Sequence, residues 1–328
     1  DRRQRQMCIR DSPNGMLFEG LKGDEVVDSW TIYSVGGGAL ANEASRLETP
    51  RSIYPLSTIS EIKEWCYHEG KTFWEYVSDC EGPEIWDYLD TVWETMCATI
   101  QRGLNNDGVL PGGLKVARKA STYWVKSKSY TDSLSSRAKI YAYALATSEE
   151  NASGGTVVTA PTCGSSGVMP AVLYHLSTSR NFLRIRILRA LATAGLFGNV
   201  AKTNSSISGA EVGCQGEVGV ACAMAAAAAC QLFGGTPSQI EYAAEMGLEH
   251  HLGLTCDPVC GLVQVPCIER NAIAAARAFD ANAYATLSDG SHMVSFDKVV
   301  EVMNETGHAL PSLYRETSEG GLAKRFKR

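Results

Sequence analysis

The chain has 328 residues, of which 45% are hydrophobic and 20% are charged. This composition is typical of a soluble globular protein of about two domains, and it excludes disordered and fibrous proteins. The formal net charge of −6 gives the chain no overall attraction to nucleic acid or to an anionic membrane surface, so we expect neither as a partner.

The first residues of the chain carry no recognisable structural pattern. Residues 1–12, D-R-R-Q-R-Q-M-C-I-R-D-S, show neither helical nor strand periodicity, and we interpret them as extraneous to the fold. They are rich in arginine and lack the apolar region of a secretory signal peptide, which favours a cytoplasmic protein. The eleven cysteines of such a protein indicate metal binding or buried thiols, and we do not expect disulfide bonds.

Short strands are predicted between residues 15 and 40. Apolar, β-branched and aromatic residues gather in Met16–Phe18, Val26–Val27 and Trp30–Val35, and glycine-containing turns lie between them. The pair Gly23-Asp24 is a hairpin signal. Two or three strands cannot bury a core of their own, so we expect this segment to belong to a larger domain.

From about residue 56 onward the pattern becomes helical. Capping boxes at Thr58-x-x-Glu61 and Thr236-x-x-Gln239 predict two helix starts. Residues 184–195 and 271–284 are also predicted as helices, and the alanine-rich run 218–233, too short to span a bilayer, is predicted as a buried core helix. One further helix is predicted from apolar residues at helical spacing, which are Trp86, Leu89, Trp93, Met96 and Ile100. The fold class is therefore mainly α.

Two loops have the composition of anion sites. Residues 154–167 are rich in glycine and hydroxyl groups and precede an apolar helix, where backbone N–H groups and hydroxyls suit a carboxylate or phosphate. The alternative is a glycine-rich turn that only caps the helix. The turn at residues 110–119, L-P-G-G-L-K-V-A-R-K, carries cations and is either an anion site or a surface loop.

Three cysteines are the strongest chemical signal in the sequence. Forty-one residues lie between Cys214 and Cys256, and ten lie between Cys256 and Cys267. Each lies in or beside a turn marked by glycine or proline, and thiolates are soft ligands that suit zinc or iron–sulfur clusters. Cys260 forms a close C-x3-C pair with Cys256 and extends the possible ligand set. Burial as small hydrophobic residues is the alternative for these thiols.

Five motifs follow one another along the chain. They are L-P-G-G-L-K-V-A-R-K-A (110–120), T-A-P-T-C-G-S-S-G (159–167), N-S-S-I-S-G-A-E-V-G-C-Q-G-E-V-G (204–219), C-D-P-V-C-G-L-V-Q-V-P-C-I-E-R-N-A (256–272) and Y-R-E-T-S-E-G-G-L-A (314–323). Together with the cysteine spacing, these motifs resemble the bacterial iron–sulfur-dependent L-serine dehydratases over residues 13–328.

The resemblance implies an architecture of two parts. Residues 13–45 resemble the C-terminal end of that family's β domain with its linker, an α/β domain whose earlier part is expected to precede the sequence. Residues 46–328 resemble the all-helical α domain. The resemblance further implies a cytoplasmic homodimer whose substrate is the small molecule L-serine.

The resemblance also implies a [4Fe-4S] cluster held by Cys214, Cys256 and Cys267, with one iron open to substrate. Cys260, where the family has a small residue, is a candidate extra ligand. The family's histidine motifs have no counterpart in this sequence, so the resemblance assigns no catalytic base. Two loops are expected to hold the carboxylate and the amine of the substrate, through Thr159, Thr162, Gly164, Ser165, Ser166, Gly167, Asn204, Ser205, Ser206 and Ser208.

The implied reaction eliminates water from L-serine and gives pyruvate and ammonia, with the open iron as a Lewis acid for the substrate hydroxyl. A related lyase that acts on L-threonine or L-cysteine would share this chemistry. A protein of another class, in which zinc or a cluster only stabilises the fold, is the second alternative.

Overall fold

The computed structural model describes residues 15–34, 40–42 and 53–326. The chain divides into two compact units, residues 1–52 and residues 53–328. Residues 1–12, expected to be extraneous, lie outside the described residues. The assignment of residues 13–45 to a β domain and of residues 46–328 to an α domain stays a prediction.

The first unit contains an antiparallel sheet with the strand order β1-β2-β3. β1 (Gly15–Lys22) pairs with β2 (Glu25–Ser34), and the short β3 (Leu40–Ala41) pairs with the end of β2. Lys22 lies opposite Glu25, so Gly23-Asp24 forms the predicted two-residue turn. Gly23 has φ +67°, a conformation that glycine adopts without a steric penalty.

One strand replaces two that the sequence predicted. Val26–Val27 and the segment from Trp30 both lie in the continuous β2. The polar pair between them, Asp28-Ser29, does not interrupt the strand because both residues keep their pairing with β1. Pairing along the ladder therefore outweighs the low strand propensity of aspartate and serine.

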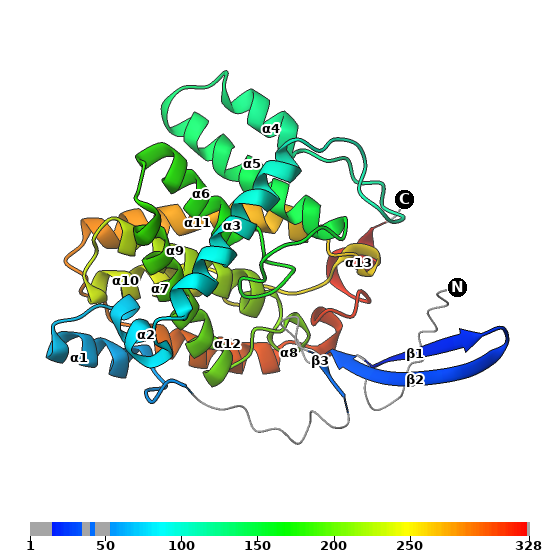
Figure 1. The fold of residues 1–328 in the computed structure, drawn as a ribbon, viewed down its shortest axis with the longest axis horizontal. Helices are drawn as coiled ribbons and strands as arrows, with labels where there is room; N and C mark the ends of the chain where they lie inside the picture. The colour runs from blue at the N-terminus through cyan, green and yellow to red at the C-terminus, as the bar shows by residue number, and fades with distance from the viewer. Residues whose placement is uncertain (1–14, 35–39, 43–52, 327–328) are drawn as a thin grey trace. The chain divides into compact units, whose positions relative to one another are not determined.

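The second unit is helical, which confirms the predicted fold class for the described residues (Figure 1). Its longer helices are α1 (Ile59–Glu69), α2 (Phe73–Glu81), α3 (Ile85–Leu104), α4 (Ala120–Ser127), α5 (Asp132–Ala152), α6 (Val168–Arg180), α7 (Arg184–Asn204), α9 (Val220–Leu232), α10 (Pro237–Glu249), α11 (Cys267–Leu287) and α12 (Phe296–Ala309). Short helical turns are α8 (Gly209–Val212), the π-helical η2 (Gln215–Gly219), the 3-10 turns η3 (Val259–Gly261) and η4 (Ser312–Tyr314), and α13 (Gly321–Arg325).

α9 lies at the centre of the helical unit (Figure 1). It confirms the predicted core helix, because every residue of α9 except Gln231 is buried. α6, α7, α10 and α11 pack around it. Small residues allow the backbones to approach closely: a Cβ atom added to Gly247 of α10 would lie 2.9 Å from the Cα of Ala223 in α9. Among the described helices, none is both long and apolar enough to cross a membrane.

The predicted helix starts are confirmed at both capping boxes. Thr58 caps α1 with Glu61, and Thr236 caps α10 with Gln239, each through reciprocal side-chain and backbone hydrogen bonds. α7 continues to Asn204, beyond the predicted end at residue 195. The residues after Gly195 are still largely buried against the core, so packing extends the helix past the glycine.

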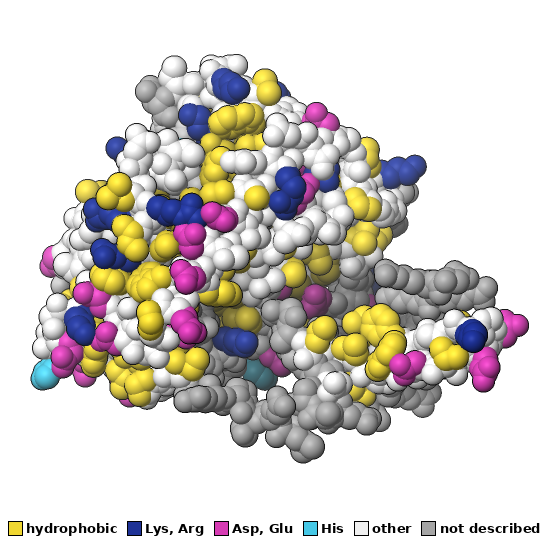
Figure 2. All heavy atoms as spheres, in the orientation of Figure 1, with side chains coloured by type: hydrophobic (Ala, Val, Ile, Leu, Met, Phe, Trp, Pro, Cys, Tyr) yellow, Lys and Arg dark blue, Asp and Glu magenta, His cyan; other side chains and the backbone are white. Residues whose placement is uncertain are grey.

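Charged side chains of both signs are interspersed on the face of the helical unit drawn in Figure 2. Several charged side chains of the helical unit form ion pairs. Arg184 contacts Asp90 and Glu94 of α3, and Lys119 contacts Glu269 of α11 at 2.9 Å. The described residues of this face therefore form a surface of mixed charge.

Gly307 of α12 allows close contact with the segment that leads to Cys214. A Cβ atom added to Gly307 would lie 2.6 Å from the Cα of Val212 in α8. We expect Gly307→Ala to lower the free energy of unfolding by about 1–3 kcal/mol, because α8 must move away from α12. Chemical denaturation measures the change.

Gly195→Ala is the matched control for that substitution. Gly195 also lies inside a helix, but an added Cβ atom would meet no neighbouring atom within 4 Å. Removing glycine from an unobstructed helix position should raise the free energy of unfolding by up to about 1 kcal/mol. Equal effects of the two substitutions would contradict the proposed role of the contact between α8 and α12.

Candidate metal centre

Cys214 is held in place by the glutamine that follows it. Gln215 is fully buried, and its side-chain amide donates to the carbonyl oxygens of Val212 (2.8 Å) and Met303 (3.1 Å). Its side-chain oxygen accepts a hydrogen bond from the backbone N–H of Gly253 (2.9 Å). The residues around Cys214 are thus tied both to α12 and to the chain that approaches Cys256.

The last of the five motifs holds the loop that carries Cys256. The backbone N–H of Cys256 donates to the carbonyl oxygen of Tyr314 (2.8 Å), and the N–H of Glu316 donates to the carbonyl oxygen of Cys256 (2.5 Å). The hydroxyl of Ser318 donates to the carbonyl oxygen of Pro258 (2.8 Å). This pairing, parallel as in a sheet, explains why a motif 58 residues after Cys256 belongs to the same site.

Cys267 is the first residue of α11, and Asn271 lies one turn further along that helix. The amide of Asn271 donates to the carbonyl oxygens of Cys267 (2.9 Å) and Gly164 (2.7 Å), and its oxygen accepts from the N–H of Gly167 (2.9 Å). Asn271 therefore joins the helix of Cys267 to the loop before α6. In this way the structure brings the second and fourth motifs together.

The side chains of Cys214, Glu217 and Cys256 converge. One sulfur atom from each cysteine and one carboxylate oxygen of Glu217 all lie within 4.8 Å of one another. Cys267 is buried nearby, where Cys214 and Glu217 influence its charge. Cys260, the candidate extra ligand, is exposed in η3 with φ +57°, and it lies outside this group.

The cysteines differ in how readily they ionise. A hydrogen bond with Cys256 and the nearby Arg270 guanidinium lower the pKa of Cys214, against the effect of burial. The same hydrogen bond, together with burial, raises the pKa of Cys256. Burial, with the charges of Cys214 and Glu217, raises the pKa of Cys267 to about 12. A lowered pKa favours the thiolate form, in which cysteine binds metals.

Arg270 connects all three cysteine segments. It lies one turn after Cys267 on α11, and its guanidinium donates to the carbonyl oxygen of Thr255 (2.6 Å) and lies 4.0 Å from the carboxylate of Asp257. Those two residues flank Cys256. Because the guanidinium also interacts with the Cys214 sulfur, a single side chain supports the positions of all three thiols.

The loop of residues 159–167 lies against Glu217. The hydroxyl of Thr162 donates to Oε1 of Glu217 (3.0 Å) and is 3.0 Å from the hydroxyl of Ser165. Gly164 faces the same carboxylate, because a Cβ atom added there would lie 3.4 Å from Oε1. Ser166 is buried, and its hydroxyl has no hydrogen-bond partner in the described structure. This part of the predicted loop is therefore adjacent to the cysteines.

The turn before Cys214 contributes through Gly209. Ser206 and Ser208 shape this turn, since the N–H of Ser208 donates to the hydroxyl of Ser206 (3.0 Å). A Cβ atom added to Gly209 would lie 2.8 Å from Oε2 of Glu217 and 3.0 Å from the sulfur of Cys256. The two serines thus belong to the turn of a glycine that packs directly against Glu217 and Cys256, where any side chain would collide with them.

Three other predicted substrate contacts are engaged elsewhere or face solvent. The side chain of Asn204 donates to the carbonyl oxygen of Ser57 (2.8 Å), and the hydroxyl of Ser205 donates to Asn304 of α12 (3.3 Å). Thr159 is exposed. Their prediction as substrate ligands stays untested, and the hydrogen bonds seen here join α7 to its neighbours.

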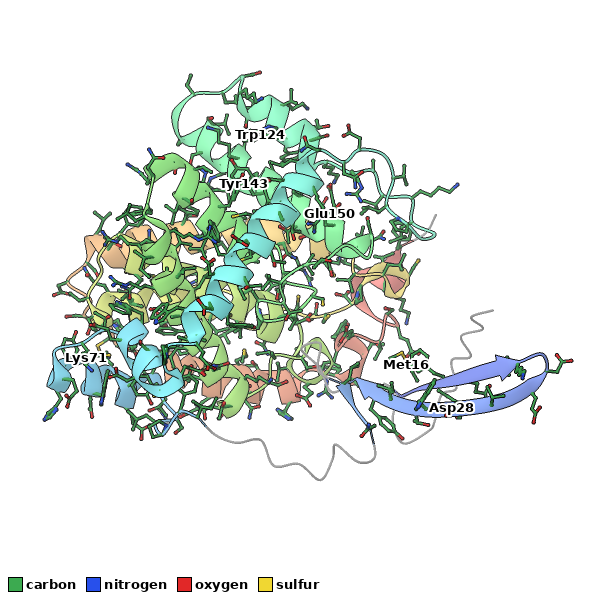
Figure 3. The ribbon with its side chains drawn as sticks, in the orientation of Figure 1. Met16, Asp28, Lys71, Trp124, Tyr143 and Glu150 are labelled. Carbon is green, nitrogen blue, oxygen red and sulfur yellow. The ribbon has the colours of Figure 1, made fainter. Side chains whose placement is uncertain are left out.

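The cation-bearing turn at residues 110–119 is held by α5. Arg118 and Asn106 both donate to Oε1 of Glu150 at 3.1 Å, and Glu150 lies near the C-terminal end of α5 (Figure 3). The guanidinium of Arg118 is almost completely buried, so this cation is part of an internal ion pair. Gln264 donates to the carbonyl oxygen of Pro111 (2.7 Å) and thereby connects this turn to the fourth motif.

The donors of this centre fit a metal group that prefers sulfur. Three buried thiols come from separate segments, the pKa of one of them is lowered, and a carboxylate lies beside them. Comparison with known proteins agrees with this. The family model described as "Serine dehydratase alpha chain" matches residues 34–323. The chain belongs to the serine dehydratase alpha chain family.

Individual members of this family match the chain over nearly all of its length. L-serine dehydratase 1 of Escherichia coli is 47% identical over 327 residues, which cover 94% of this chain and 71% of that protein. The L-serine dehydratase of Streptomyces coelicolor is 46% identical, over 97% of this chain and 73% of that protein. That of Mycobacterium tuberculosis is 42% identical, over 95% and 71%.

Three residues of the centre were not singled out from the sequence. Glu217 lies in the same family motif as Cys214, and its spacing of three residues is a signal that places both side chains on one face of a helical turn. Arg270 and Asn271 lie one turn after Cys267, at the same kind of spacing. No local signal indicates which distant backbone groups they bind.

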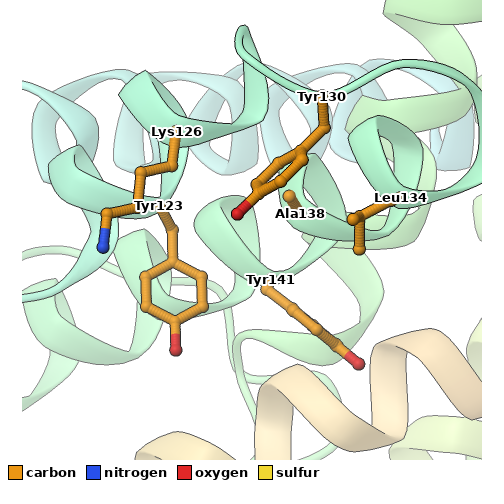
Figure 4. A pocket seen from close by; sticks show the side chains of 6 residues that line it. All are labelled: Tyr123, Lys126, Tyr130, Leu134, Ala138 and Tyr141. Carbon is orange, nitrogen blue, oxygen red and sulfur yellow. The ribbon is translucent and has the colours of Figure 1, made fainter.

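A separate hollow of about 290 Å³ lies between α4 and α5 (Figure 4). Tyrosine rings and the aliphatic parts of neighbouring side chains form most of its wall. Its lining residues are Tyr123, Lys126, Tyr130, Leu134, Ala138 and Tyr141. They belong to none of the five family motifs, and we assign the hollow no part in the chemistry of the cysteine centre.

Proposed function

We propose that the chain is an L-serine dehydratase, which removes water from L-serine and yields pyruvate and ammonia. The observation that carries this proposal is the match to relatives that bear this name, over more than nine-tenths of the chain. The convergence of family motifs on one cysteine centre supports it, because function is located in such a site and not in the fold alone.

The proposed cofactor is a [4Fe-4S] cluster held by Cys214, Cys256 and Cys267. Support comes from the burial of all three thiols and from the lowered pKa of Cys214, since clusters are bound by thiolates. When bound, the cluster would supply a Lewis-acidic iron for the substrate hydroxyl. Glycine at positions 164 and 209 keeps side chains away from the carboxyl group of Glu217, and at 209 also from the sulfur of Cys256.

The hydroxyl-rich loop is the proposed carboxylate site. Gly167 is the N-cap residue of α6, a helix of 13 residues, and the positive end of the helix dipole favours an anion there. The buried hydroxyl of Ser166, which lacks a partner among the described residues, is available to donate to a substrate oxygen. Loss of the Cα proton and of the hydroxyl leaves aminoacrylate, whose hydrolysis gives pyruvate and ammonia. The base that removes the proton is not assigned to a residue.

The remaining parts of the proposal rest on the sequence resemblance. They are a homodimeric assembly, a cytoplasmic location, L-serine as the preferred substrate over L-threonine or L-cysteine, and the assignment of residues 13–45 to the end of a β domain. Size-exclusion chromatography with light scattering tests the first. Comparison of kcat/KM for the three amino acids tests the third.

The main test is anaerobic reconstitution with iron and sulfide, followed by assay of pyruvate from L-serine. Because the relatives are longer than the segments they share with this chain, we would assay both this chain and a chimera. In the chimera, the matching segment of this chain replaces that of the Escherichia coli enzyme. We expect a brown protein that bleaches in air and, in the chimera at least, iron-dependent formation of pyruvate.

A protein in which the metal only stabilises the fold would give a different result in this reconstitution assay. A centre that only stabilises the fold would bind zinc in a stoichiometric amount, and neither protein would form pyruvate after reconstitution with iron. That pair of results would overturn the proposed function.

A further inference from the structure

The carboxylate of Glu217 is fixed at one oxygen and open at the other. Oε1 accepts a hydrogen bond from the hydroxyl of Thr162 (3.0 Å). Oε2 has a single weak contact, with the sulfur of Cys256 at 3.9 Å. The side chain is partly exposed, whereas both cysteines near it and Thr162 are buried. A small molecule that reaches the cysteines would therefore meet Oε2.

The space in front of this carboxylate is bordered by glycine. A Cβ atom at position 209 would lie 2.8 Å from Oε2, and one at position 164 would lie 3.4 Å from Oε1. Among the hydrogen bonds and ion pairs of the described residues, none joins Glu217 to a lysine, an arginine or a histidine. The described residues thus supply no cation for this carboxylate, and a side chain at position 209 would collide with Oε2.

The surroundings of Glu217 are negatively charged. Its electrostatic neighbours include the thiol of Cys214, whose ionised form is negative, and the carboxyl group of Glu316. Arg270 acts in the opposite direction, but its guanidinium is already bonded to the carbonyl oxygen of Thr255 and lies beside Asp257. A cationic group placed at Oε2 would reduce this repulsion, because buried charges are stable only when they are paired.

We propose that the carboxylate of Glu217 binds the ammonium group of the amino acid substrate, with Thr162 fixing the orientation of the carboxylate. This inference rests on the proposed function and adds a specificity residue to it. Glu217 would select molecules that carry an α-amino group over analogues that lack it. The ammonium at Oε2 and the substrate carboxylate at the start of α6 would together orient the Cα–H bond and the hydroxyl toward the cysteine side.

The test is a thermodynamic cycle between the protein charge and the ligand charge. Glu217→Gln keeps the size of the side chain and its hydrogen bond to Thr162 but removes the charge. The ligands are L-serine and β-hydroxypropanoate, which is L-serine without its amine. Binding to the reconstituted holoenzyme is followed by calorimetry and by the change in the electron paramagnetic resonance spectrum of the reduced cluster, so the readout does not depend on turnover.

We expect Glu217→Gln to raise the Kd of L-serine roughly ten- to a hundredfold, which is the usual effect of losing a charged hydrogen bond. The Kd of β-hydroxypropanoate should change by less than about threefold, because this ligand has no amine to lose. Glu211→Gln is the matched control. Glu211 lies in α8 of the same motif and is exposed, so neither ligand should be affected.

A second variant decides the outcome if Glu217→Gln loses its iron. Thr162→Val removes the donor that orients the carboxylate and leaves the charge, and it should weaken L-serine binding several-fold with no effect on β-hydroxypropanoate. Equal weakening of both ligands, or of neither, in the iron-loaded variant would overturn the proposal. Selective weakening of L-serine in a protein that forms no pyruvate would sustain it while the proposed function fails.

Discussion

Cys214→Ser is expected to abolish iron binding and pyruvate formation together. The thiolate form of Cys214 is favoured because Cys256 and Arg270 lower the pKa of this thiol. A serine hydroxyl of nearly the same size cannot replace it, since it is a hard ligand and is not ionised near neutral pH. We expect activity to fall by more than about a hundredfold, the upper end of the loss seen when only a supporting contact is removed.

The measurements are iron and sulfide content, visible absorption and pyruvate formation after anaerobic reconstitution. Cys97→Ser is the matched control, because Cys97 is a partly exposed thiol of α3 that no metal-binding group includes. It should keep full iron content and activity. Cys260→Ala should also keep its iron, since that thiol is exposed outside the centre. Activity in an iron-free Cys214→Ser protein would contradict the ligand assignment.

The helices could be predicted from the sequence because their signals are local. The capping box of Thr58 and Glu61 lies within four residues, and the buried stripe of α3 needs only a regular spacing. The end of α7 could not be predicted in this way. Gly195 is a local signal for a stop, but the burial of the residues after it depends on helices that are distant in the sequence.

The residues of the candidate metal centre also differ in whether the sequence could identify them. Spacing and family resemblance selected three cysteines, and the structure brings Cys214 and Cys256 into one group. They did not select Glu217, Arg270 or Asn271, because the importance of these residues depends on long-range partners. Asn271, for example, binds a carbonyl group 107 residues earlier in the chain. Hydrogen bonds of this range leave no periodic pattern in the sequence.

The structure explains the role of the last of the five motifs, residues 314–323, which the sequence alone could not explain. Tyr314 and Glu316 are hydrogen-bonded to the backbone of Cys256, and the N–H of Leu322 donates to Asp257 beside it. The segment therefore acts on the centre through backbone pairing. It holds the loop that carries Cys256. A substitution in this segment should therefore lower the amount of cluster retained without unfolding the helical unit.

Arg270→Met is the second substitution with a large expected effect. It removes the donor to the carbonyl oxygen of Thr255 and the cation beside Asp257, while the apolar stem of the side chain is preserved. A buried acceptor and a buried carboxylate are then left with fewer partners, which should lower the free energy of unfolding by about 1–3 kcal/mol. The loss of positive charge near Cys214 should also raise the pKa of that thiol and weaken its hold on a metal.

We therefore expect the iron retained by Arg270→Met after reconstitution and desalting to fall by about tenfold or more, the effect of removing a group that orients metal ligands. Arg277→Met is the matched control: Arg277 lies two turns further along α11 and donates to the carbonyl oxygen of His250 (2.8 Å), away from the three cysteines. Arg270→Lys keeps the charge but not the fork of donors, so its iron content should be intermediate. If Arg270→Met and Arg277→Met retained equal iron, Arg270 would not be the residue that connects the three ligand segments, and the centre would depend on backbone pairing alone.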